Sequence, residues 1–539
     1  MKIESITRRT MLKRNITLVL SLAGIFLVQG CHQELKEPNI LFIFCDQMSP
    51  RTMGWVGETE VQTPHLDEFS ESAYCFTNAY CTSPVCAPAR HSIYTGVYPS
   101  RHWVKKNDTR MNDEYKTIMA MMNEEGYTTA NIGKMHNAPY HHRRDFQYVL
   151  NHEFFVGSAG ISHYDAYLKS ELEKRGIGDY QPYSHVPKGK LWLQVAEGIA
   201  SVNPLPEELV PEHWMTREAL KFMDDQAEKR PDQPFFLHLS YFPPHHPYMP
   251  VKKYADMYLD KLDELELPPN YDHEAMQKWC RSKMTPDSLS VEDVKYFRAL
   301  YFGFMTQLDA ALGDLVAGME ERGLMDNTIV VFTSDHGDNL GEHGRFYKGN
   351  MYEGSVRVPL MVHWPSHKLK SRKIINDNVS HVDMVSTLLE ASGIEAPEYM
   401  PGKNMLPLMK GRESWESHEV FSEYYSNRRW EPSQLMLRKG DFKLIYTTDT
   451  EFGDWETFFY NVKEDPWEMK DLMQDPALVD TLWNHIDILL NEYWNDVREH
   501  RSTDDIRIVP RVQYDMQWPA DPWKPVKIKE GQESYYSEY

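Results

Sequence analysis

The sequence contains few cysteines and only one long apolar run. Six cysteines occur among 539 residues, and no two of them have the CxxC spacing of zinc and iron–sulfur sites. The 58 lysines and arginines are outnumbered by 80 aspartates and glutamates, so the net charge of −22 argues against a nucleic-acid partner. Internal repeats and low-complexity tracts are absent. The length excludes a single small module, and 41% hydrophobic with 12% aromatic residues exclude wholesale disorder.

The apolar run, residues 16–28, lies near the N-terminus behind four basic residues. It is short for a bilayer span, so residues 1–30 are predicted to be a signal peptide and residues 31–38 a linker. The run leads into Leu-Val-Gln-Gly before Cys31, which resembles a lipoprotein cleavage site; ordinary cleavage nearby is the alternative. A twin-arginine pattern at residues 7–13 offers export of a folded protein as a second route. We expect a bacterial periplasmic or surface protein, lipid-anchored at Cys31.

Three continuous apolar runs predict strands buried on both faces of a sheet: Asn39–Cys45, Pro234–Leu239 and Thr328–Phe332. Segments with helical spacing of apolar residues predict helices at Thr117–Glu125, Met215–Glu228 and Val294–Gly323. Strands that alternate with helices indicate a doubly wound α/β fold. In such folds functional groups gather beyond the carboxyl ends of the strands, which is where Asp46, Asp335 and His336 fall.

A change in composition after Gly411 predicts a second, smaller domain. We assign residues 39–415 to the large α/β domain and residues 416–539 to an α+β domain packed on it. The expected elements of the smaller domain are a strand at Met436–Tyr446, a second strand at Phe458–Val462, a helix at Leu482–Val497 and a surface tail at Trp518–Tyr539.

The stretch around Cys86 carries the most informative pattern in the chain. Cys86, Pro88 and Arg90 stand at alternate positions, and Thr95-Gly96 follows. This pattern resembles the signature of the type I sulfatases, a family of the alkaline phosphatase-like superfamily. In that family the cysteine is oxidised to formylglycine (3-oxoalanine), an aldehyde that acts as its hydrate. Without the resemblance, the same residues describe a loop cysteine beside a proline turn.

Other segments match the same family, in the same order, along nearly the whole mature chain. They are Asn39–Asp46, Thr63–Asp67, Gly133–His136, Pro244–Pro247, Thr333–Gly337, Lys348–Pro359, Phe459–Val462 and Asp465–Glu468. The resemblance implies a large mixed, mostly parallel sheet flanked by helices, with a smaller C-terminal α+β domain. It also implies a sulfatase that hydrolyses sulfate monoesters.

A divalent cation is part of what the resemblance implies. Its ligands would be Asp46, Gln47, Cys86, Asp335 and His336. Carboxylate and amide oxygens suit Ca²⁺, with Mg²⁺ as the alternative. Gln47 stands where many relatives have an aspartate, and imidazole is uncommon around calcium. His336 is therefore either a ligand or a contact of the sulfate.

The resemblance also gives roles to three cations. Arg90, Lys134 and Lys348 would neutralise the sulfate and the hydrated aldehyde. One hydroxyl of the hydrate would attack sulfur, with the metal lowering its pKa. The resulting sulfate ester on position 86 would then collapse and release inorganic sulfate.

Three histidines are candidates for proton transfer. His245 would donate a proton to the leaving alcohol, and His136 would remove the remaining hydroxyl proton. His246 is the alternative donor, or a substrate contact, because the doubled histidine shifts the match by one position.

Two other functions fit the sequence. A phosphonate or phosphodiester hydrolase of the same superfamily shares the signature and an Asp-Gln pair like Asp46-Gln47. A non-catalytic glycan-binding lipoprotein would keep the fold and leave Cys86 unmodified. Ala89 stands where many relatives have serine, so either a formylglycine-generating or a radical-type maturase would act on Cys86.

The substrate class follows from the predicted export. A surface enzyme of this kind fits sulfated glycans of the glycosaminoglycan or mucin type. The segments expected to contact the sugar are residues 141–146, 192–214 and 242–248, together with Arg428, Arg429 and Trp430. Because the net charge of −22 repels polyanions, we expect the substrates to be chain ends or short fragments and not a whole polysulfated polymer.

Overall fold

A computed structural model describes most of the chain from Glu37 to Tyr493. The described residues are 37–56, 60–107, 109–112, 114–136, 145–152, 162–177, 200–282, 289–411, 415, 418–426, 433–447 and 457–493. The expected signal peptide, the lipidation site at Cys31 and the tail at Trp518–Tyr539 lie outside them. In this described part, no helix combines the length and apolar character needed to cross a membrane.

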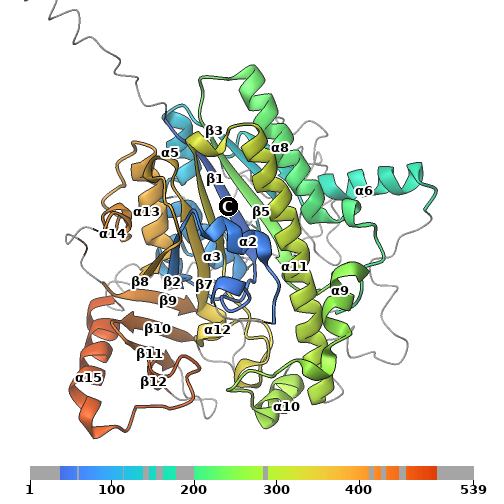
Figure 1. Cartoon of the computed structure of the whole chain (residues 1–539). Coiled ribbons are helices and arrows are strands. Elements are labelled where there is room, and N and C mark those ends of the chain that lie inside the picture. The colour runs from blue at the N-terminus through green and yellow to red at the C-terminus, as the bar shows by residue number, and fades with distance from the viewer. Residues whose placement is uncertain are drawn as a thin grey trace, which may run out of the picture. The chain divides into compact units, whose positions relative to one another are not determined.

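An eight-stranded sheet forms the centre of the unit that begins at Asn39 (Figure 1). Its strands are β1 (Asn39–Asp46), β2 (Tyr74–Tyr80), β3 (Thr128–Gly133), β4 (Tyr148–Asn151), β5 (Phe235–Pro244), β6 (Thr328–Ser334), β7 (Arg357–His363) and β8 (Lys373–Ser380). Their order is β4-β3-β5-β1-β6-β7-β2-β8. Strand β7 is antiparallel to both of its neighbours, and the other pairs are parallel. The predicted mixed, mostly parallel α/β sheet is therefore confirmed.

The central strand β1 supplies side chains to two hydrophobic cores, one on each face of the sheet. Leu41 and Ile43 belong to one core, and Phe42 and Phe44 belong to the other. Each of these side chains is at most 2% exposed. This is why β1 is a continuous apolar run instead of an alternating one.

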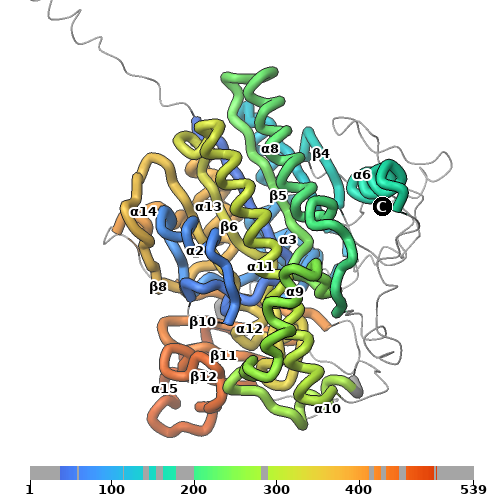
Figure 2. Tube along the Cα trace, turned by 45° about the vertical axis from the view of Figure 1, so that its right-hand side comes forward, coloured from blue at the N-terminus to red at the C-terminus, as the bar shows by residue number. Residues whose placement is uncertain are grey.

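Helices cover both faces of the sheet (Figures 1 and 2). They are α2 (Pro64–Ser70), α3 (Cys86–Thr95), α4 (Pro99–His102), α5 (Ile118–Glu124), α6 (His163–Lys174), α8 (Pro211–Lys229), α9 (Lys252–Leu259), α10 (His273–Ser282), α11 (Val291–Glu321), α12 (Glu353–Val356), α13 (His381–Ala391) and α14 (Leu406–Met409). The apolar sides of α8 and α11 pack into the first core, and those of α3, α5 and α13 pack into the second.

The three predicted helices exist, with shifted starts. Thr117 is the N-cap of α5, and its side chain accepts a hydrogen bond from the backbone N–H of Ala120. Helix α8 begins four residues before the predicted Met215, because a proline at position 211 suits the first turn of a helix. A capping box of Ser290 and Asp293 starts α11 before the predicted Val294.

A separate antiparallel sheet has the order β12-β11-β10-β9. Its strands are β9 (Val420–Tyr424), β10 (Gln434–Lys439), β11 (Phe442–Thr447) and β12 (Phe458–Asn461), and helix α15 (Val479–Asp487) follows. The prediction of one strand over Met436–Tyr446 was wrong: Gly440, at φ +56°, turns the chain, so this stretch is a hairpin. The predicted helix at 482–497 begins at Val479 and gives way to a π-helical segment at Ile488–Tyr493. The domain boundary near residue 415 stays a prediction.

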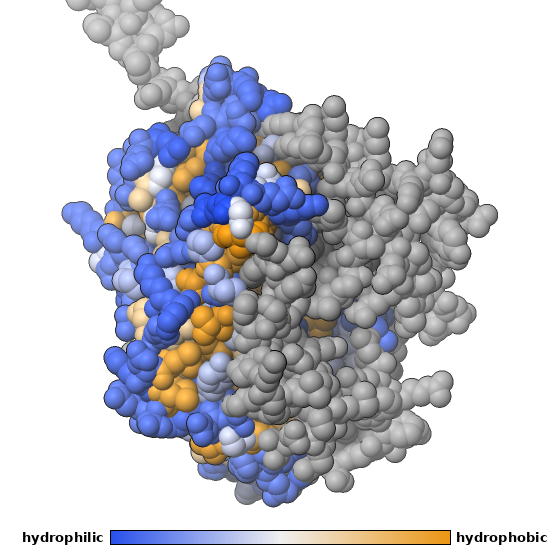
Figure 3. Space-filling model, turned by 90° about the vertical axis from the view of Figure 1, so that its right-hand side faces the viewer, coloured by the Kyte–Doolittle hydropathy of each residue, from blue (hydrophilic) through white to orange (hydrophobic). Residues whose placement is uncertain are grey.

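On the side that Figure 3 shows, most of the surface of the described residues is hydrophilic. A band of apolar residues runs beside the hydrophilic surface. Large apolar side chains are concentrated in the two cores of the large sheet and in a third core on the smaller sheet, which includes Leu437 and Phe459.

Gly133, the last residue of β3, lies where the backbones of β3 and β5 approach closely. Its φ is +103°, and a Cβ atom there would lie 2.1 Å from the backbone oxygen of Ser240 in β5. Gly126 has a similar φ of +89° with nothing within 4 Å of such an atom. We expect Gly126→Ala to lower the free energy of unfolding by about 1 kcal/mol, the conformational cost alone. Gly133→Ala should lower it clearly more, as measured by thermal unfolding; equal losses would contradict the close packing.

Candidate active site

The carboxyl ends of four parallel strands bring polar side chains together at one edge of the large sheet. Asp46 ends β1, Asp335 follows the neighbouring strand β6, Lys134 follows β3 and His245 follows β5. This is the location expected for functional groups in a doubly wound sheet.

Cys86 is the first residue of α3 and is 1% exposed. Its sulfur lies 2.9 Å from Nζ of Lys348, 3.2 Å from Nε2 of His336 and 3.8 Å from Oδ1 of Asp46. Burial, and after it the charge of Asp46, raise the pKa of the thiol, although both neighbouring lysines lower it. An unmodified Cys86 is therefore protonated and a weak nucleophile in this position.

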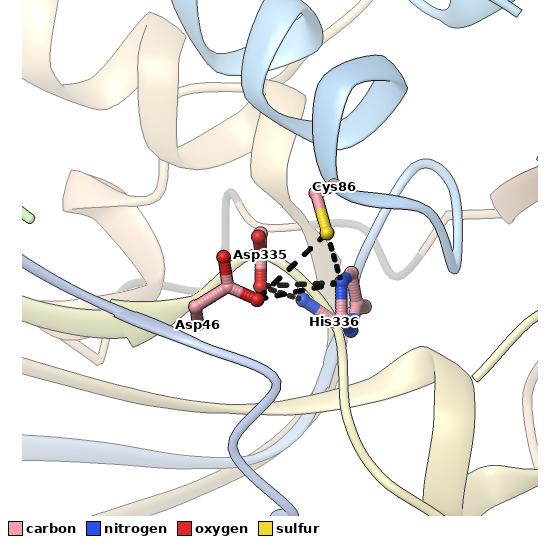
Figure 4. A group of neighbouring side chains, drawn as sticks. All are labelled: Asp46, Cys86, Asp335 and His336. Atoms are coloured by element: carbon pink, nitrogen blue, oxygen red, sulfur yellow. Dashed lines mark hydrogen bonds and ion pairs between the residues drawn. The ribbon is translucent and has the colours of Figure 1, made fainter. Parts of the chain in front are cut away.

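Asp46, Cys86, Asp335 and His336 converge on one point (Figure 4). One potential ligand atom of each lies within 4.8 Å of those of the other three, and all four residues are buried. The ring Nδ1 of His336 lies 3.0 Å from the carbonyl oxygen of Gly337, so Nδ1 carries the proton. Its Nε2 therefore presents a lone pair to the two carboxylates, an arrangement that suits a bound cation.

Arg90 is bonded to both of these carboxylates. Its Nη2 donates to Asp46 over 3.1 Å and its Nε donates to Asp335 over 3.0 Å, and all three side chains are 0% exposed. Nη1 donates to the hydroxyl of Ser240 and to the backbone oxygen of Lys134. The hydrogen bonds of the guanidinium thus go to residues of the site, and Arg90 holds the two carboxylates in place.

The carboxylate of Asp46 is the electrostatic centre of the site. Burial would raise its pKa, but Lys134, and after it His245, Lys348 and Arg90, hold that pKa well below its usual range. Asp46 is therefore ionised. Nζ of Lys134 contacts its Oδ2 directly, and Nζ of Lys348 lies 3.9 Å from its Oδ1.

The structure distinguishes the two adjacent histidines, whose rings stack with centroids 4.0 Å apart. His245 donates through Nδ1 to the backbone oxygen of His246, and its Nε2 lies 3.9 Å from Asp46. His246 accepts a hydrogen bond at Nδ1 from the amide of Gln47. Nε2 of His245 thus faces Asp46, whereas His246 is hydrogen-bonded to Gln47.

His136, the expected proton acceptor, lies in the turn after β3. It is 3% exposed and adopts φ +50°. Burial lowers its pKa well below the ordinary value, and Lys134 and Arg90 lower it further. The imidazole is therefore neutral, as a proton acceptor must be, but burial and the cations make it a weak base.

The sequence analysis missed Asp338, which is fully buried behind the site. Its Oδ2 accepts hydrogen bonds of 2.6 Å from the amide of Gln47 and from the hydroxyl of Tyr248. Because the amide nitrogen of Gln47 is held there, its Oε1 is directed to Lys348, 2.7 Å away. Asp338 stands directly after the segment Thr333–Gly337, a position that spacing alone does not mark as functional.

A cavity of about 540 Å³ lies next to the site, lined in part by His152, Phe242 and Pro247. The ring of Phe242 packs 5.0 Å from that of His245 and 5.3 Å from Nζ of Lys134. None of the clustered carboxylates and cations is among the described residues that line this cavity. Phe242 thus stands between the cavity and the charged cluster.

Of the segments expected to contact a sugar, residues 242–248 include His245 and His246 of the site, whereas Phe146 and Trp214 are buried in the two cores of the large sheet. Residues 141–144 and 192–199, together with Arg428, Arg429 and Trp430, lie outside the described residues.

The site combines two carboxylates, an imidazole lone pair and several cations in a cluster at the edge of an α/β sheet. Such a combination suits a small anion held beside a metal ion, an arrangement that many hydrolases use. The sulfatase family model matches residues 38–394, and the model of the C-terminal region of N-sulphoglucosamine sulphohydrolase matches residues 341–493. The chain belongs to the sulfatase family and is a sulfuric ester hydrolase.

Individual proteins resemble this chain in sequence or in fold. An arylsulfatase of Clostridium perfringens is 28% identical over 491 residues, which are 88% of this chain and 97% of that protein. A phosphonate monoester hydrolase of Agrobacterium radiobacter has the same fold, with a TM-score of 0.69, 21% identity, and coverage of 86% of this chain and 96% of its own. A protein solved with its substrate D-glucosamine-2-N,6-O-disulfate has a TM-score of 0.66 at 21% identity, with coverage of 87% of this chain and 100% of its own.

Asp338 offers a test of the amide orientation at Gln47. Asp338→Asn exchanges an acceptor for a group that can donate, so the amide of Gln47 is expected to turn and lose the alignment of its Oε1. We expect divalent-metal affinity and kcat/KM to fall by about 10- to 100-fold. Tyr248→Phe leaves the acceptor for Gln47 intact and should have a smaller effect. Metal content after dialysis and sulfate release measure both; equal effects of the two variants would contradict the orientation.

Proposed function

We propose that this sulfatase hydrolyses sulfate monoesters on carbohydrates, with Cys86 oxidised to formylglycine as the source of the nucleophile. The placement of Cys86 carries the proposal. Its sulfur is the atom that Lys348, His336 and Asp46 surround, yet a buried thiol with a raised pKa is a poor nucleophile. An aldehyde hydrate at the same position would present a hydroxyl to the same groups.

A divalent cation fits the residues around position 86. Asp46, Gln47, Asp335 and His336, with position 86 itself, would hold it. Two carboxylates and an amide oxygen favour Ca²⁺, with Mg²⁺ as the alternative. When bound, the ion would lower the pKa of the attacking hydroxyl and balance the charge of the sulfate.

Lys134 and Lys348 are the proposed sulfate-binding cations. Lys348 reaches Cys86 and Gln47 with its Nζ, and Lys134 approaches from the end of β3. Arg90, bonded to both carboxylates, contributes by fixing their positions and adding positive charge.

His245 is the proposed proton donor to the leaving alcohol, and His136 the proposed base. His245 projects toward Asp46 with its Nε2, whereas Nδ1 of His246 is occupied by the amide of Gln47. This difference favours His245 over His246, which we assign to substrate contact.

The proposed substrate is a sulfated sugar of the glycosaminoglycan or mucin type. One protein of the same fold has a disulfated glucosamine as its substrate, so the fold accommodates such a sugar. The basic and apolar N-terminal segment supports export to the periplasm or cell surface, with a lipid anchor at Cys31. A formylglycine-generating or radical-type maturase would act on Cys86.

The modification at position 86 is tested on protein purified from its native host. Mass spectrometry of the peptide that contains position 86 should show the aldehyde instead of a thiol. Cys86→Ala should abolish sulfate release from sulfated mono- and disaccharides and leave thermal unfolding unchanged. Cys75→Ala removes another buried thiol and should keep activity. An unmodified thiol, or full activity of Cys86→Ala, would refute the nucleophile; faster hydrolysis of phosphodiesters than of any sulfate would assign the phosphonate-type activity.

The role of His245 is tested by comparing leaving groups. A sugar alcohol must leave with a proton, whereas nitrophenolate departs without one. His245→Ala should therefore lower kcat/KM for a sugar sulfate by about 10²- to 10⁴-fold and have little effect on nitrophenyl sulfate. His246→Ala serves as the matched control; a larger loss in that variant, selective for the sugar sulfate, would exchange the two roles.

The same assignment predicts a pH dependence. Burial, His246 and Lys348 lower the pKa of His245 well below 6.5. The protonated fraction of the free enzyme falls as pH rises above that lowered pKa, so kcat/KM for a sugar sulfate should decline with rising pH through neutrality. The profile for nitrophenyl sulfate should lack this decline, and a parallel decline for both would contradict the role.

A further inference from the structure

A buried ion cluster joins the C-terminal sheet to the loop that carries Lys348. Nζ of Lys443, in β11, lies 2.9 Å from Oε1 of Glu353 and 2.7 Å from Oε1 of Glu468. The other oxygen of Glu468 accepts a 2.7 Å hydrogen bond from the backbone N–H of Glu353. The side chain of Lys443 is 0% exposed, and those of the two glutamates are at most 5% exposed.

A contribution to the free energy of unfolding does not by itself explain why these three charged residues are buried together. The cost of removing three charges from water can exceed the attraction between them, and apolar residues often replace buried ion pairs without loss. Glu468 also adopts φ +52°, a conformation that favours glycine. What the ions provide instead is a fixed geometry, because each partner is held by directional bonds.

The geometry that they fix is that of the loop after Lys348. Glu353 begins helix α12, five residues beyond Lys348. On the other side of Lys348, the backbone N–H of Tyr347 donates to Asp338 over 2.9 Å. The loop that carries the lysine is thus anchored at both ends, by Asp338 before it and by Glu353 after it.

The turn that contains Glu468 also contacts the loop after β1. Arg51 donates to the backbone oxygen of Pro466 over 2.6 Å, and its guanidinium lies 3.8 Å from the centre of the Trp467 ring. Arg51 is four residues beyond Gln47. One turn therefore contacts the loops that supply Gln47 and Lys348, whose side chains meet over 2.7 Å.

We propose that Lys443 and Glu468 are positioning residues, which hold Glu353 and thereby place Nζ of Lys348 beside position 86. The inference rests on the proposed role of Lys348 in binding sulfate. Lys443 and Glu468 bond to Glu353, not to the reacting atoms, so they act through the loop.

Glu468→Gln tests the proposal, because it removes the charge and keeps the shape. Loss of the placement of Lys348 should lower kcat/KM for sulfate esters by about 10- to 100-fold. Lys463→Met is the matched control: Lys463 pairs with Asp441 at the surface and is 69% exposed. It should keep the activity of the unchanged protein, and thermal unfolding shows whether each variant folds.

A double-mutant cycle with Lys348→Met separates positioning from a merely structural role. If Glu468 acts through Lys348, Glu468→Gln causes no further loss of kcat/KM in the Lys348→Met protein. Losses that multiply would overturn the positioning role, as would full activity of Glu468→Gln. If Lys348→Met itself keeps full activity, the proposed sulfate-binding role of Lys348 fails instead. Should Glu468→Gln not fold, Glu353→Gln, which removes the other carboxylate, takes its place in the same cycle.

Discussion

Two buried carboxylates of like charge meet at the carboxyl ends of adjacent strands, and most of the site can be understood as compensation for them. Asp46 and Asp335 are both 0% exposed, and atoms of the two lie within 4.8 Å. Their repulsion is roughly 3 to 4 kcal/mol at the effective dielectric constant of a protein. Arg90 spans both carboxylates with one edge of its guanidinium, and Lys134 adds a second cation to Asp46. These two cations already balance the two carboxylates, so a divalent ion would add an excess of positive charge for a sulfate.

The local charge is opposite in sign to that of the whole chain. A protein of net charge −22 repels polyanions at long range, and the salt of its surroundings screens this repulsion within about 10 Å. Arg90 and Lys134 are buried and the side chain of Lys348 is 15% exposed, so screening at the site is weak. A single sulfate bound at the proposed site would therefore interact with Lys134 and Lys348 much more than with the acidic surface.

The sequence was most informative at positions where a polar residue directly follows a predictable buried strand. The apolar run at 39–45 predicted a buried strand, and the residue after it, Asp46, falls at the edge where functional groups gather. Spacing did not reveal Asp338, whose importance depends on the orientation of one amide, nor Lys443 and Glu468, which are distant in sequence from Lys348. The hairpin at Gly440 was missed because two strands joined by a tight turn have the same alternation as one strand. Contacts between distant segments have no local signal.

If a maturase modifies Cys86 as proposed, the burial of this residue also sets an order of events for the newly synthesised protein. A side chain that is 1% exposed at the start of α3, with the sheet edge around it, is out of reach of another enzyme once the chain has folded. Oxidation of this cysteine would therefore have to precede folding of the large sheet. The oxidation would have to occur after residue 86 is synthesised and before the last strands of the large sheet have folded. A chain that folded before oxidation would have a native structure and no activity.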